Sequence, residues 1–151
     1  MIPFEELPDN ARLWSYQSDR KLTATEKSWI EEILPPFLAE WAAHGAKLNA
    51  YGAVLGDYHV VLAVNEDQAN ASGCSIDSSV RFIKQLEKEL NVSFFNRLKM
   101  LVDNGQDVFF TSYSELDQLP PDTLVYNNMV MSVGEWKNSW KVPVSSLLNN
   151  H

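Results

Sequence analysis

An almost unbroken apolar run from Tyr58 to Val64 is the feature that most limits what this chain can fold into. Such a run is typical of an interior strand that is flanked on both edges and covered by helices. Gly56 and Asp57 separate it from another strand-like run, residues 47–55. Glycine at the first position of a two-residue loop suits a type II′ turn. We therefore expect a hairpin whose second strand lies inside a sheet.

An amphipathic helix is predicted over residues 76–90, after a stretch of small and polar residues. Ser75 is a suitable N-cap, and Asp77 places a negative charge in the first turn, where it meets the positive end of the helix dipole. The charged side of this helix is interpreted as a solvated face. Its apolar stripe comprises Ile76, Val80, Ile83, Leu86 and Leu90, and its charged face comprises Arg81, Lys84, Glu87, Lys88 and Glu89.

An earlier helix is predicted to start at Thr23 and to end near Gly45. Thr23 and Glu26 have the spacing of a capping box, and apolar residues recur at helical spacing down to residue 44. Pro35 and Pro36 lack amide donors and disfavour helical geometry in the residue before them. We expect a kink or a brief break there, with both halves packed on the same surface.

The remaining strands complete a fold prediction. Residues 12–17 form a first strand, and residues 98–103 and 106–112 flank Asn104-Gly105, the dipeptide typical of a type I′ hairpin turn. The order strand, helix, hairpin, helix, strand is that of a ferredoxin-like α+β sandwich, here with an extra hairpin. We predict one domain over residues 1–151, with a core at about 12–112 and a C-terminal extension at about 113–151, which contains a helical turn at 114–119 and a strand within 123–133.

Composition excludes several function classes. The chain has 20 acidic and 12 basic residues and a formal charge of -8, which disfavours binding to nucleic acid or to anionic membranes. A single cysteine, no secretory signal and no apolar stretch of about 20 residues predict a cytoplasmic protein without membrane insertion. No metal-ligand motif and no phosphate-binding loop occur, so we expect no metal, no cofactor and no ATPase of that type.

Cys74 carries the sharpest chemical hypothesis. It precedes a predicted helix N-terminus, where backbone amides and the helix dipole stabilise a thiolate. His44 or His59 would have to supply the base, although His59 alternates with apolar residues and is better explained as a satisfied sheet histidine. Asp77 competes for the same helix end, and the alternative is a buried loop cysteine without reactivity.

The same helix start could hold an anion. Gly73, Cys74, Ser75 and Ile76 would present their backbone amides to a phosphate or a carboxylate. Asp77 again opposes this role, and ordinary capping is the alternative explanation.

Four short stretches of the sequence carry a resemblance to known proteins. They are residues 14–20, 41–45, 72–80 and 140–143, of which Ser-Gly-Cys-Ser-Ile-Asp at 72–77 is the most specific. Through them the chain resembles, over about residues 12 to 144, a family of short bacterial proteins often labelled "ABC transporter ATPase". That label conflicts with the sequence, which lacks the phosphate-binding loop and is too short for an ABC nucleotide-binding domain; we interpret the label as wrong.

The resemblance implies no activity, but it draws attention to a shared group of polar residues. These are Gly73 to Asp77, Gln17 to Arg20, and His44. We predict a non-catalytic binding or interaction domain whose ligand or partner protein sits near residues 65–77, with Gly73, Ser75, Asp77, Arg20 and His44 as contacts. The alternative is a small thiol-dependent enzyme or redox protein that uses Cys74. A homodimer is an open alternative for the partner.

Overall fold

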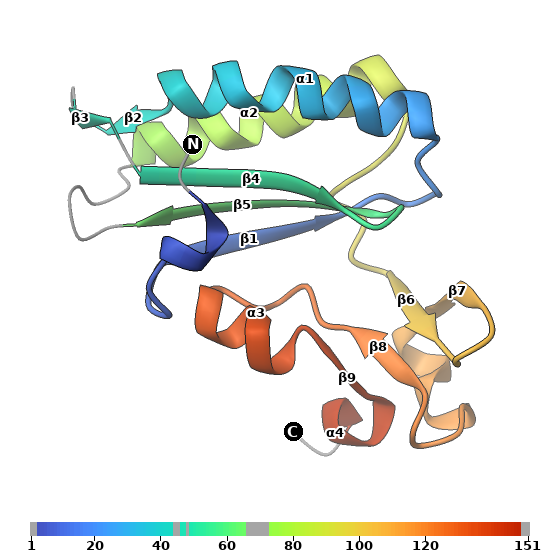
Figure 1. The fold of residues 1–151 in the computed structure, drawn as a ribbon. Coiled ribbons are helices and arrows are strands. Elements are labelled where there is room, and N and C mark those ends of the chain that lie inside the picture. The colour runs from blue at the N-terminus through green and yellow to red at the C-terminus, as the bar shows by residue number, and fades with distance from the viewer. Residues whose placement is uncertain (1–2, 44–45, 48, 66–72, 149–151) are drawn as a thin grey trace.

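The computed structural model describes residues 3–43, 46–47, 49–65 and 73–148, and it has a mixed α+β architecture (Figure 1). All strand pairings among these residues are antiparallel. Two larger sheets, with strand orders β1-β5-β4 and β7-β6-β8-β9, accompany a short β2-β3 ribbon. In chain order the elements are η1 (Phe4–Glu6), β1 (Arg12–Gln17), α1 (Ala24–Glu40), β2 (Ala42–Ala43), β3 (Ala46–Lys47), β4 (Asn49–Leu55), β5 (His59–Asn65), α2 (Gly73–Leu90), β6 (Lys99–Asp103), β7 (Val108–Ser112), η2 (Tyr113–Gln118), β8 (Leu124–Tyr126), α3 (Val133–Ser139), β9 (Lys141–Pro143) and α4 (Val144–Leu148).

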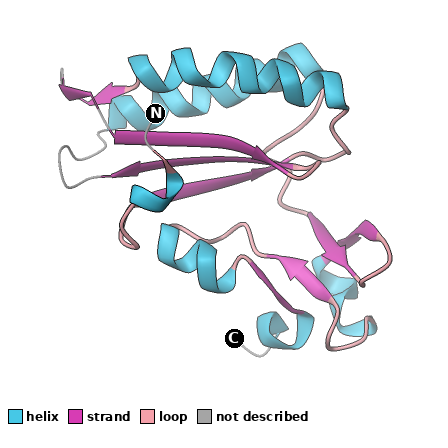
Figure 2. Ribbon diagram, in the orientation of Figure 1, coloured by secondary structure: helices cyan, strands magenta, loops and turns pink. Residues whose placement is uncertain are grey.

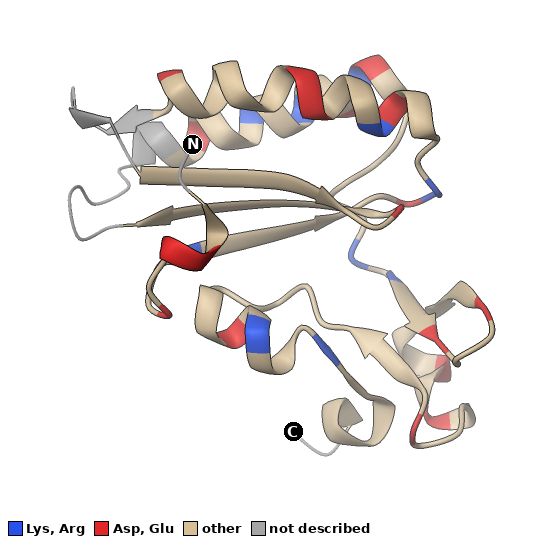
Figure 3. Ribbon diagram, in the orientation of Figure 1, with Lys and Arg blue, Asp and Glu red and all other residues tan. Residues whose placement is uncertain are grey.

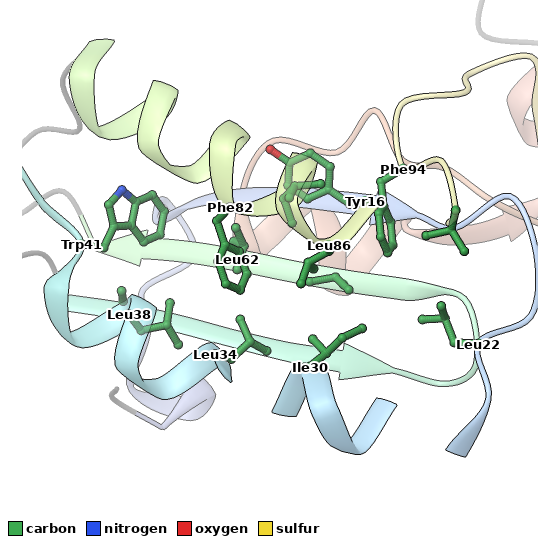
Figure 4. Close-up of a cluster of buried hydrophobic side chains, with 14 of the residues drawn as sticks. Tyr16, Leu22, Ile30, Leu34, Leu38, Trp41, Leu62, Phe82, Leu86 and Phe94 are labelled. Atoms are coloured by element: carbon green, nitrogen blue, oxygen red, sulfur yellow. The ribbon is translucent and has the colours of Figure 1, made fainter. Parts of the chain in front are cut away.

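The apolar run forms β5, the middle strand of the first sheet, as predicted. β5 pairs with β1 on one edge and with β4 on the other, and all its residues from His59 to Val64 are buried. α1 and α2 lie side by side over one face of this sheet (Figures 1 and 2). Figure 4 shows Leu34 of α1 and Leu86 of α2 close to Leu62 of β5, in a core that all three elements share.

Helix α1 starts as predicted but continues through its prolines. Thr23 accepts a hydrogen bond from the Glu26 amide, and the Glu26 carboxylate accepts one from the Thr23 amide, which completes the capping box. Pro35 and Pro36 lie on the exposed side of the helix, where water can reach the carbonyl groups that lose their amide partners. The helix is therefore assigned without a break.

The same helix ends earlier than predicted. It stops at Glu40 instead of reaching Gly45, which lies outside the described residues. Trp41 is buried against Phe37 and Trp14, and its backbone is already extended. From there the chain turns into the β2-β3 ribbon, so burial of the Trp41 ring coincides with the end of the helix.

Helix α2 confirms the prediction for residues 76–90 but begins at Gly73. Ser75 is therefore inside the first turn and does not occupy the N-cap position predicted for it. Phe82, Ile83 and Leu86 face the core. Glu87 is not merely solvated, because its carboxylate accepts a hydrogen bond from the backbone amide of Phe94 at 2.7 Å.

Both predicted hairpins form, but with longer loops than their dipeptides indicated. Leu55 pairs with His59, so residues 56–58 connect β4 to β5, and Gly56 has φ +60°. Asp103 pairs with Val108, so residues 104–107 connect β6 to β7. The Asn104 side chain accepts hydrogen bonds from the two following backbone amides at positions 106 and 107. This side-chain turn replaces the type I′ geometry.

The second sheet explains why the ferredoxin-like arrangement is not confirmed. A ferredoxin-like sheet places its fourth strand beside the first strand. Here β6 pairs with β7 and β8 instead, and β8 pairs with β9. The hairpin assigned to the core thus shares a sheet with the C-terminal segment. At the edge of β1 the structure has a single bridge between Arg12 and Ser132.

The C-terminal tryptophans, unassigned from sequence, pack across the other face of the first sheet. Trp136 of α3 and Trp140 stack with their ring centroids 5.1 Å apart, and both pack on the cluster that contains Leu13 and Val61. Phe4 of η1 meets Trp136 edge to face at 5.2 Å. The first sheet is therefore covered on both faces, by α1 and α2 on one and by η1 and α3 on the other.

Candidate functional site

The residues predicted to form a site do not gather at one place. Gly73, Cys74 and Ser75 contribute backbone to the first turn of α2, and Asp77 is exposed just beyond them. The side chains of residues 73–75 lie outside the described part of the structure, and so does His44. The roles predicted for Cys74 as a nucleophile and for its neighbours as ligand contacts stay predictions.

Arg20 lies at the opposite end of α2. Its guanidinium donates to both carboxylate oxygens of Glu26, at 2.8 and 2.7 Å, and to the carbonyl of Leu90 at 2.7 Å. A helix rises about 1.5 Å per residue, so Leu90 is about 25 Å from Gly73. The hydrogen bond from Arg20 lowers the pKa of Glu26 to about 2. Arg20 therefore joins two helix ends and is not brought to Gly73–Asp77.

His59 is a buried sheet histidine, as predicted, but it is not fully satisfied. Its ring is 2% exposed and lies 4.9 Å, centroid to centroid, from both Tyr126 and Trp140. Burial lowers its pKa to about 3, opposed by the side chain of Asn128. Its Nε2 has no hydrogen-bond partner among the described residues. His59 thus packs against Trp140 on the face of the sheet away from α2.

A groove of about 770 Å³ follows the outer edge of β1, the edge that does not face β5. One wall consists of Val80 of α2 and residues 94–97 of the connection that leads to β6. The opposite wall is residues 126–131, between β8 and α3. We call this hollow the β1 groove. It lies where the fourth strand of a ferredoxin-like sheet would be expected, and the strand that should fill it belongs to the second sheet.

The edge of β1 inside the groove has unpaired backbone. The Leu13 amide donates to the carbonyl of Met131 at 3.0 Å, on the side away from β5. Alternate residues of an antiparallel strand direct their backbone groups to the same side, so those of Ser15 and Gln17 also point into the groove. Neither amide has a hydrogen-bond partner among the described residues.

Side chains of three segments and one backbone carbonyl form a polar floor under this edge. The Ser15 hydroxyl donates to Asn128 Oδ1 at 2.7 Å, and Asn128 Nδ2 donates to Gln17 Oε1 at 2.8 Å. Gln17 Nε2 donates to the carbonyl of Lys99 at 3.2 Å, and Trp140 Nε1 donates to Ser15 Oγ at 3.1 Å. These bonds hold the walls of the groove in place against β1.

The charge of the groove is opposite to that of the whole chain. Arg12, Arg97 and Lys99 line it, and no aspartate or glutamate does. Neither Arg97 nor Lys99 has a carboxylate within ion-pair distance in the described part of the chain. Figure 3 shows basic and no acidic residues along the connection from α2 into β6. Because the chain carries a formal charge of -8, the groove is a local basic site on an acidic protein.

Exposed apolar side chains concentrate at the rim of the same groove. Within the described ranges, the exposed large hydrophobic residues are Phe95, Leu98, Val108, Tyr113, Met129 and Met131. Four of the six line the groove, and Leu98 lies between two lining residues. Met129 and Met131 are 67% and 69% exposed. Clustered apolar exposure of this kind marks interaction surfaces, and methionine adapts to varied partners.

Tyr16 forms the apolar side of the groove next to α2. Its ring meets Phe95 edge to face, with centroids 5.6 Å apart. Burial raises the pKa of its hydroxyl, opposed by a hydrogen bond with Ser79 and by the charge of Arg97. Tyr16 is therefore neutral at physiological pH and contributes apolar surface.

A smaller hollow of about 390 Å³ lies between α1 and α2, nearer to the start of α2. Phe37 and Phe82 stack at its base, with ring centroids 4.2 Å apart. Its charged lining residues are Glu40 and Arg81, one of each sign. It lacks the basic character of the β1 groove.

Two negative findings bear on function. Within residues 3–43, 46–47, 49–65 and 73–148, no group of three or more histidine, cysteine or acidic side chains is placed to hold a metal ion. No helix in that part of the chain is long and apolar enough to cross a membrane.

The comparisons with known proteins give no match. No protein-family model matches the chain, and neither a curated protein nor a solved structure matches it. The resemblance to short bacterial proteins stays a prediction.

The β1 groove was missed from sequence because its walls are far apart along the chain. Ser15 and Asn128 are 113 residues apart. One local signal was present: Met129 and Met131 alternate with Val130 after two asparagines. Val130 is buried and both methionines are exposed, so the alternation marks an extended segment with an unusually apolar outer side.

Proposed function

We propose that this chain is a binding domain without catalytic activity, and that the β1 groove accepts an apolar, negatively charged segment of a partner protein. The observation that carries this proposal is the gathering of exposed hydrophobic side chains at the groove, together with Arg97 and Lys99. Apolar rim residues favour desolvated contact, and the cations select for an acidic partner.

The chemistry of the lining supports binding over catalysis. The described residues that line the β1 groove include no histidine, cysteine, aspartate or glutamate. General acid–base catalysis most often uses a histidine or a carboxylate, and the serine, lysine and tyrosine side chains of the groove have neither among the lining residues to activate them. Asparagine, serine and backbone amides supply hydrogen bonds instead, which orient a ligand without reacting with it.

Two dyes test the site before any partner is known. 8-Anilinonaphthalene-1-sulfonate is aromatic and anionic, whereas N-phenyl-1-naphthylamine is aromatic and uncharged. We expect the native protein to bind the anionic dye saturably, with fluorescence enhancement. An Arg97→Gln/Lys99→Gln variant should bind it about tenfold more weakly, because two charge contacts are lost, and should bind the neutral dye as before.

The matched control is Lys84→Gln/Lys88→Gln, which removes the same charge from the exposed side of α2. It should leave both dye affinities unchanged. Equal weakening by the two double variants would reduce the effect to net charge. Absence of saturable binding to the folded wild-type protein would overturn the proposal.

Other predicted occupants remain proposals of lower rank. The alternatives are a small ligand, a second copy of the chain, and a ligand near residues 65–77. The first two would change the chemistry of the occupant, and the third would move the site. The β1 groove is favoured because exposed apolar side chains and the cations Arg97 and Lys99 gather at it. A cytoplasmic location also stays a prediction.

The thiol alternative is supported by one observation. Cys74 lies in the first turn of an 18-residue helix, the position at which a helix favours a thiolate. Iodoacetamide alkylation of the folded protein over a range of pH values tests it. A midpoint well below that of free cysteine would favour a reactive thiol, and a midpoint near that of free cysteine or full protection would remove this alternative.

A further inference from the structure

We infer that the segment bound in the β1 groove is an extended peptide that pairs with the outer edge of β1 as an additional strand. This inference rests on the proposed function and specifies how the partner binds. It follows from the backbone of β1, the side chains on either side of it, and the charges at one end.

The available edge has definite limits. The chain itself occupies both ends, through Leu13 to the Met131 carbonyl and through the Asp19 amide, which donates to the carbonyl of Ser93 at 2.9 Å. Between these two bonds, the backbone groups of Ser15 and Gln17 point outward. Ser15 lies inside the strand, and Gln17 is its last residue. Strands rise about 3.3 Å per residue, so the interval from residue 13 to residue 19 spans about 20 Å. A strand of about three to five residues fits it.

A peptide backbone suits this edge better than a small apolar anion. Outward amides and carbonyls alternate in an order that another strand reproduces, whereas a simple hydrophobic acid offers acceptors alone. The stretch from Leu13 to Gln17 contains no charged residue and no proline, which are the usual means of protecting an edge strand from pairing. Between the bonds at Leu13 and Asp19 the edge is thus unpaired, and it lacks both of these forms of protection.

The side chains around the edge determine which residue types the bound peptide should have at alternate positions. Alternate residues of an added strand face opposite sides of the sheet. One side meets Tyr16, Val80 and Phe94, which favour apolar residues. The other side meets Asn128 and Met129, which tolerate polar or apolar residues.

Charge fixes the acidic end of the peptide. The Gln17 side chain reaches the Lys99 backbone, so the Gln17 end of the edge lies beside the basic pair Arg97 and Lys99. An aspartate, a glutamate or a C-terminal carboxylate is expected there. A second copy of this chain is a poor occupant, because each copy has a formal charge of -8.

The experiment begins with a library of random eight-residue peptides displayed on phage. The library is selected on the intact protein and counter-selected on the Arg97→Gln/Lys99→Gln variant, and recovered peptides are synthesised. We expect alternating apolar residues with a carboxylate near one end, and displacement of the anionic dye from the native protein. Failure to recover peptides that distinguish the two proteins would overturn the inference.

Hydrogen exchange then identifies the binding geometry. On peptide addition, the amides of Ser15 and Gln17 should exchange at least tenfold more slowly. The amides of Trp14 and Tyr16, which already pair with β5, serve as internal controls and should change little. N-methylation of the peptide should weaken binding at alternate residues only, because every second amide of the added strand faces β1.

The outcomes separate the two proposals. A peptide that displaces the dye without protecting Ser15 and Gln17, and without the alternating pattern, would overturn strand addition and leave the proposed function intact. A native protein that binds neither dye nor peptide would overturn both. Protection of both amides together with alternating N-methyl sensitivity would support both.

Discussion

The two edges of β1 have opposite environments. Its inner edge is paired with β5 along the whole strand, from Arg12 to Gln17, beneath the core that α1 and α2 cover. Its outer edge has a bridge at one end and open backbone beyond it, surrounded by polar and basic side chains. One strand thus pairs within the core sheet along one edge and borders the groove proposed to bind a partner along the other.

The comparison separates the region that stabilises the fold from the region proposed to bind a partner. The helix-covered core consists of closely packed apolar side chains, and their loss leaves cavities. The β1 groove is held by a few long-range hydrogen bonds and bordered by exposed residues. Substitutions in the core should therefore change the free energy of unfolding, whereas substitutions at the rim of the groove should change binding.

The largest effect is expected for Leu86→Ala. Leu86 is fully buried in the helix-covered core, so truncation removes apolar contacts and leaves a cavity. We expect a loss of about 2–5 kcal/mol in the free energy of unfolding, measured by urea denaturation. The control is Glu89→Ala, an exposed position of the same helix, which should cost less than about 0.5 kcal/mol. Similar losses for the two variants would contradict the assignment of the core.

The next effect is a dependence of stability on pH through His59. Its pKa is about 3 in the folded protein and near its ordinary value of 6.5 in the unfolded chain. Below pH 6.5 the unfolded chain binds a proton that the folded protein does not, so stability falls as the pH falls towards 3. The loss approaches about 1.4 kcal/mol per pH unit well below pH 6.5 and amounts to about 2 kcal/mol between pH 7 and 5.

Urea denaturation at several pH values measures this slope. Glu26, with a pKa of about 2, contributes below about pH 4.5 and so lies outside the chosen window. A His59→Phe variant keeps a ring beside Tyr126 and Trp140 but cannot titrate, and it should lose most of the slope. An unchanged slope in this variant would show that other groups cause the dependence.

A smaller effect is expected for Asn128→Ala, which cuts the polar floor of the β1 groove. The substitution removes hydrogen bonds to Ser15 and Gln17. We expect a loss of about 1–1.5 kcal/mol in the free energy of unfolding and weaker binding of the anionic dye. Asn138→Ala, at an exposed asparagine of α3, is the comparison. If Asn138→Ala had the larger effect on both measurements, the floor would not hold the groove.

The smallest effect on stability is expected for Arg97→Gln/Lys99→Gln. Both side chains are exposed, so the free energy of unfolding should change by less than about 0.5 kcal/mol. The same variant is predicted to weaken binding of the anionic dye. Stability is measured by thermal denaturation beside the wild-type protein. A large loss of stability would mean that these cations support the fold, and the contrast between core and groove would fail.

Local patterns predicted the elements whose structure depends on nearby residues. The capping box of Thr23 and Glu26, the apolar run of β5 and the stripe of α2 were all visible in sequence, because each reflects contacts within one element or burial of one face. A kink or a brief break was predicted at Pro35, and the break does not occur, because both prolines lie on the exposed side of α1, where water can reach the carbonyl groups that lose their amide partners. The two hairpin loops were placed correctly but assigned the wrong turn geometry.

The tertiary arrangement and the groove depend on contacts that sequence spacing does not reveal. β6 pairs with β8 instead of β1, and Val102 and Val125 of these two strands are buried in one cluster with Leu116 and Val144. Arg20 was predicted to share a site with Gly73–Asp77 because both belong to polar stretches of the sequence. In the folded protein, Arg20 contacts the last residue of α2, whereas Gly73–Asp77 form its first turns.

The position of Arg20 has a consequence for how the two covering helices are joined. Its guanidinium donates to the Glu26 carboxylate in the first turn of α1 and to the last carbonyl of α2. The carboxylate suits the positive N-terminal end of α1, and the guanidinium suits the negative C-terminal end of α2, so one ion pair links the two helix termini. Arg20 lies just before α1, and Leu90, the last residue of α2, lies 70 residues further along the chain. The C-terminal end of α2 is thus fixed by a side chain that is synthesised long before α2 itself.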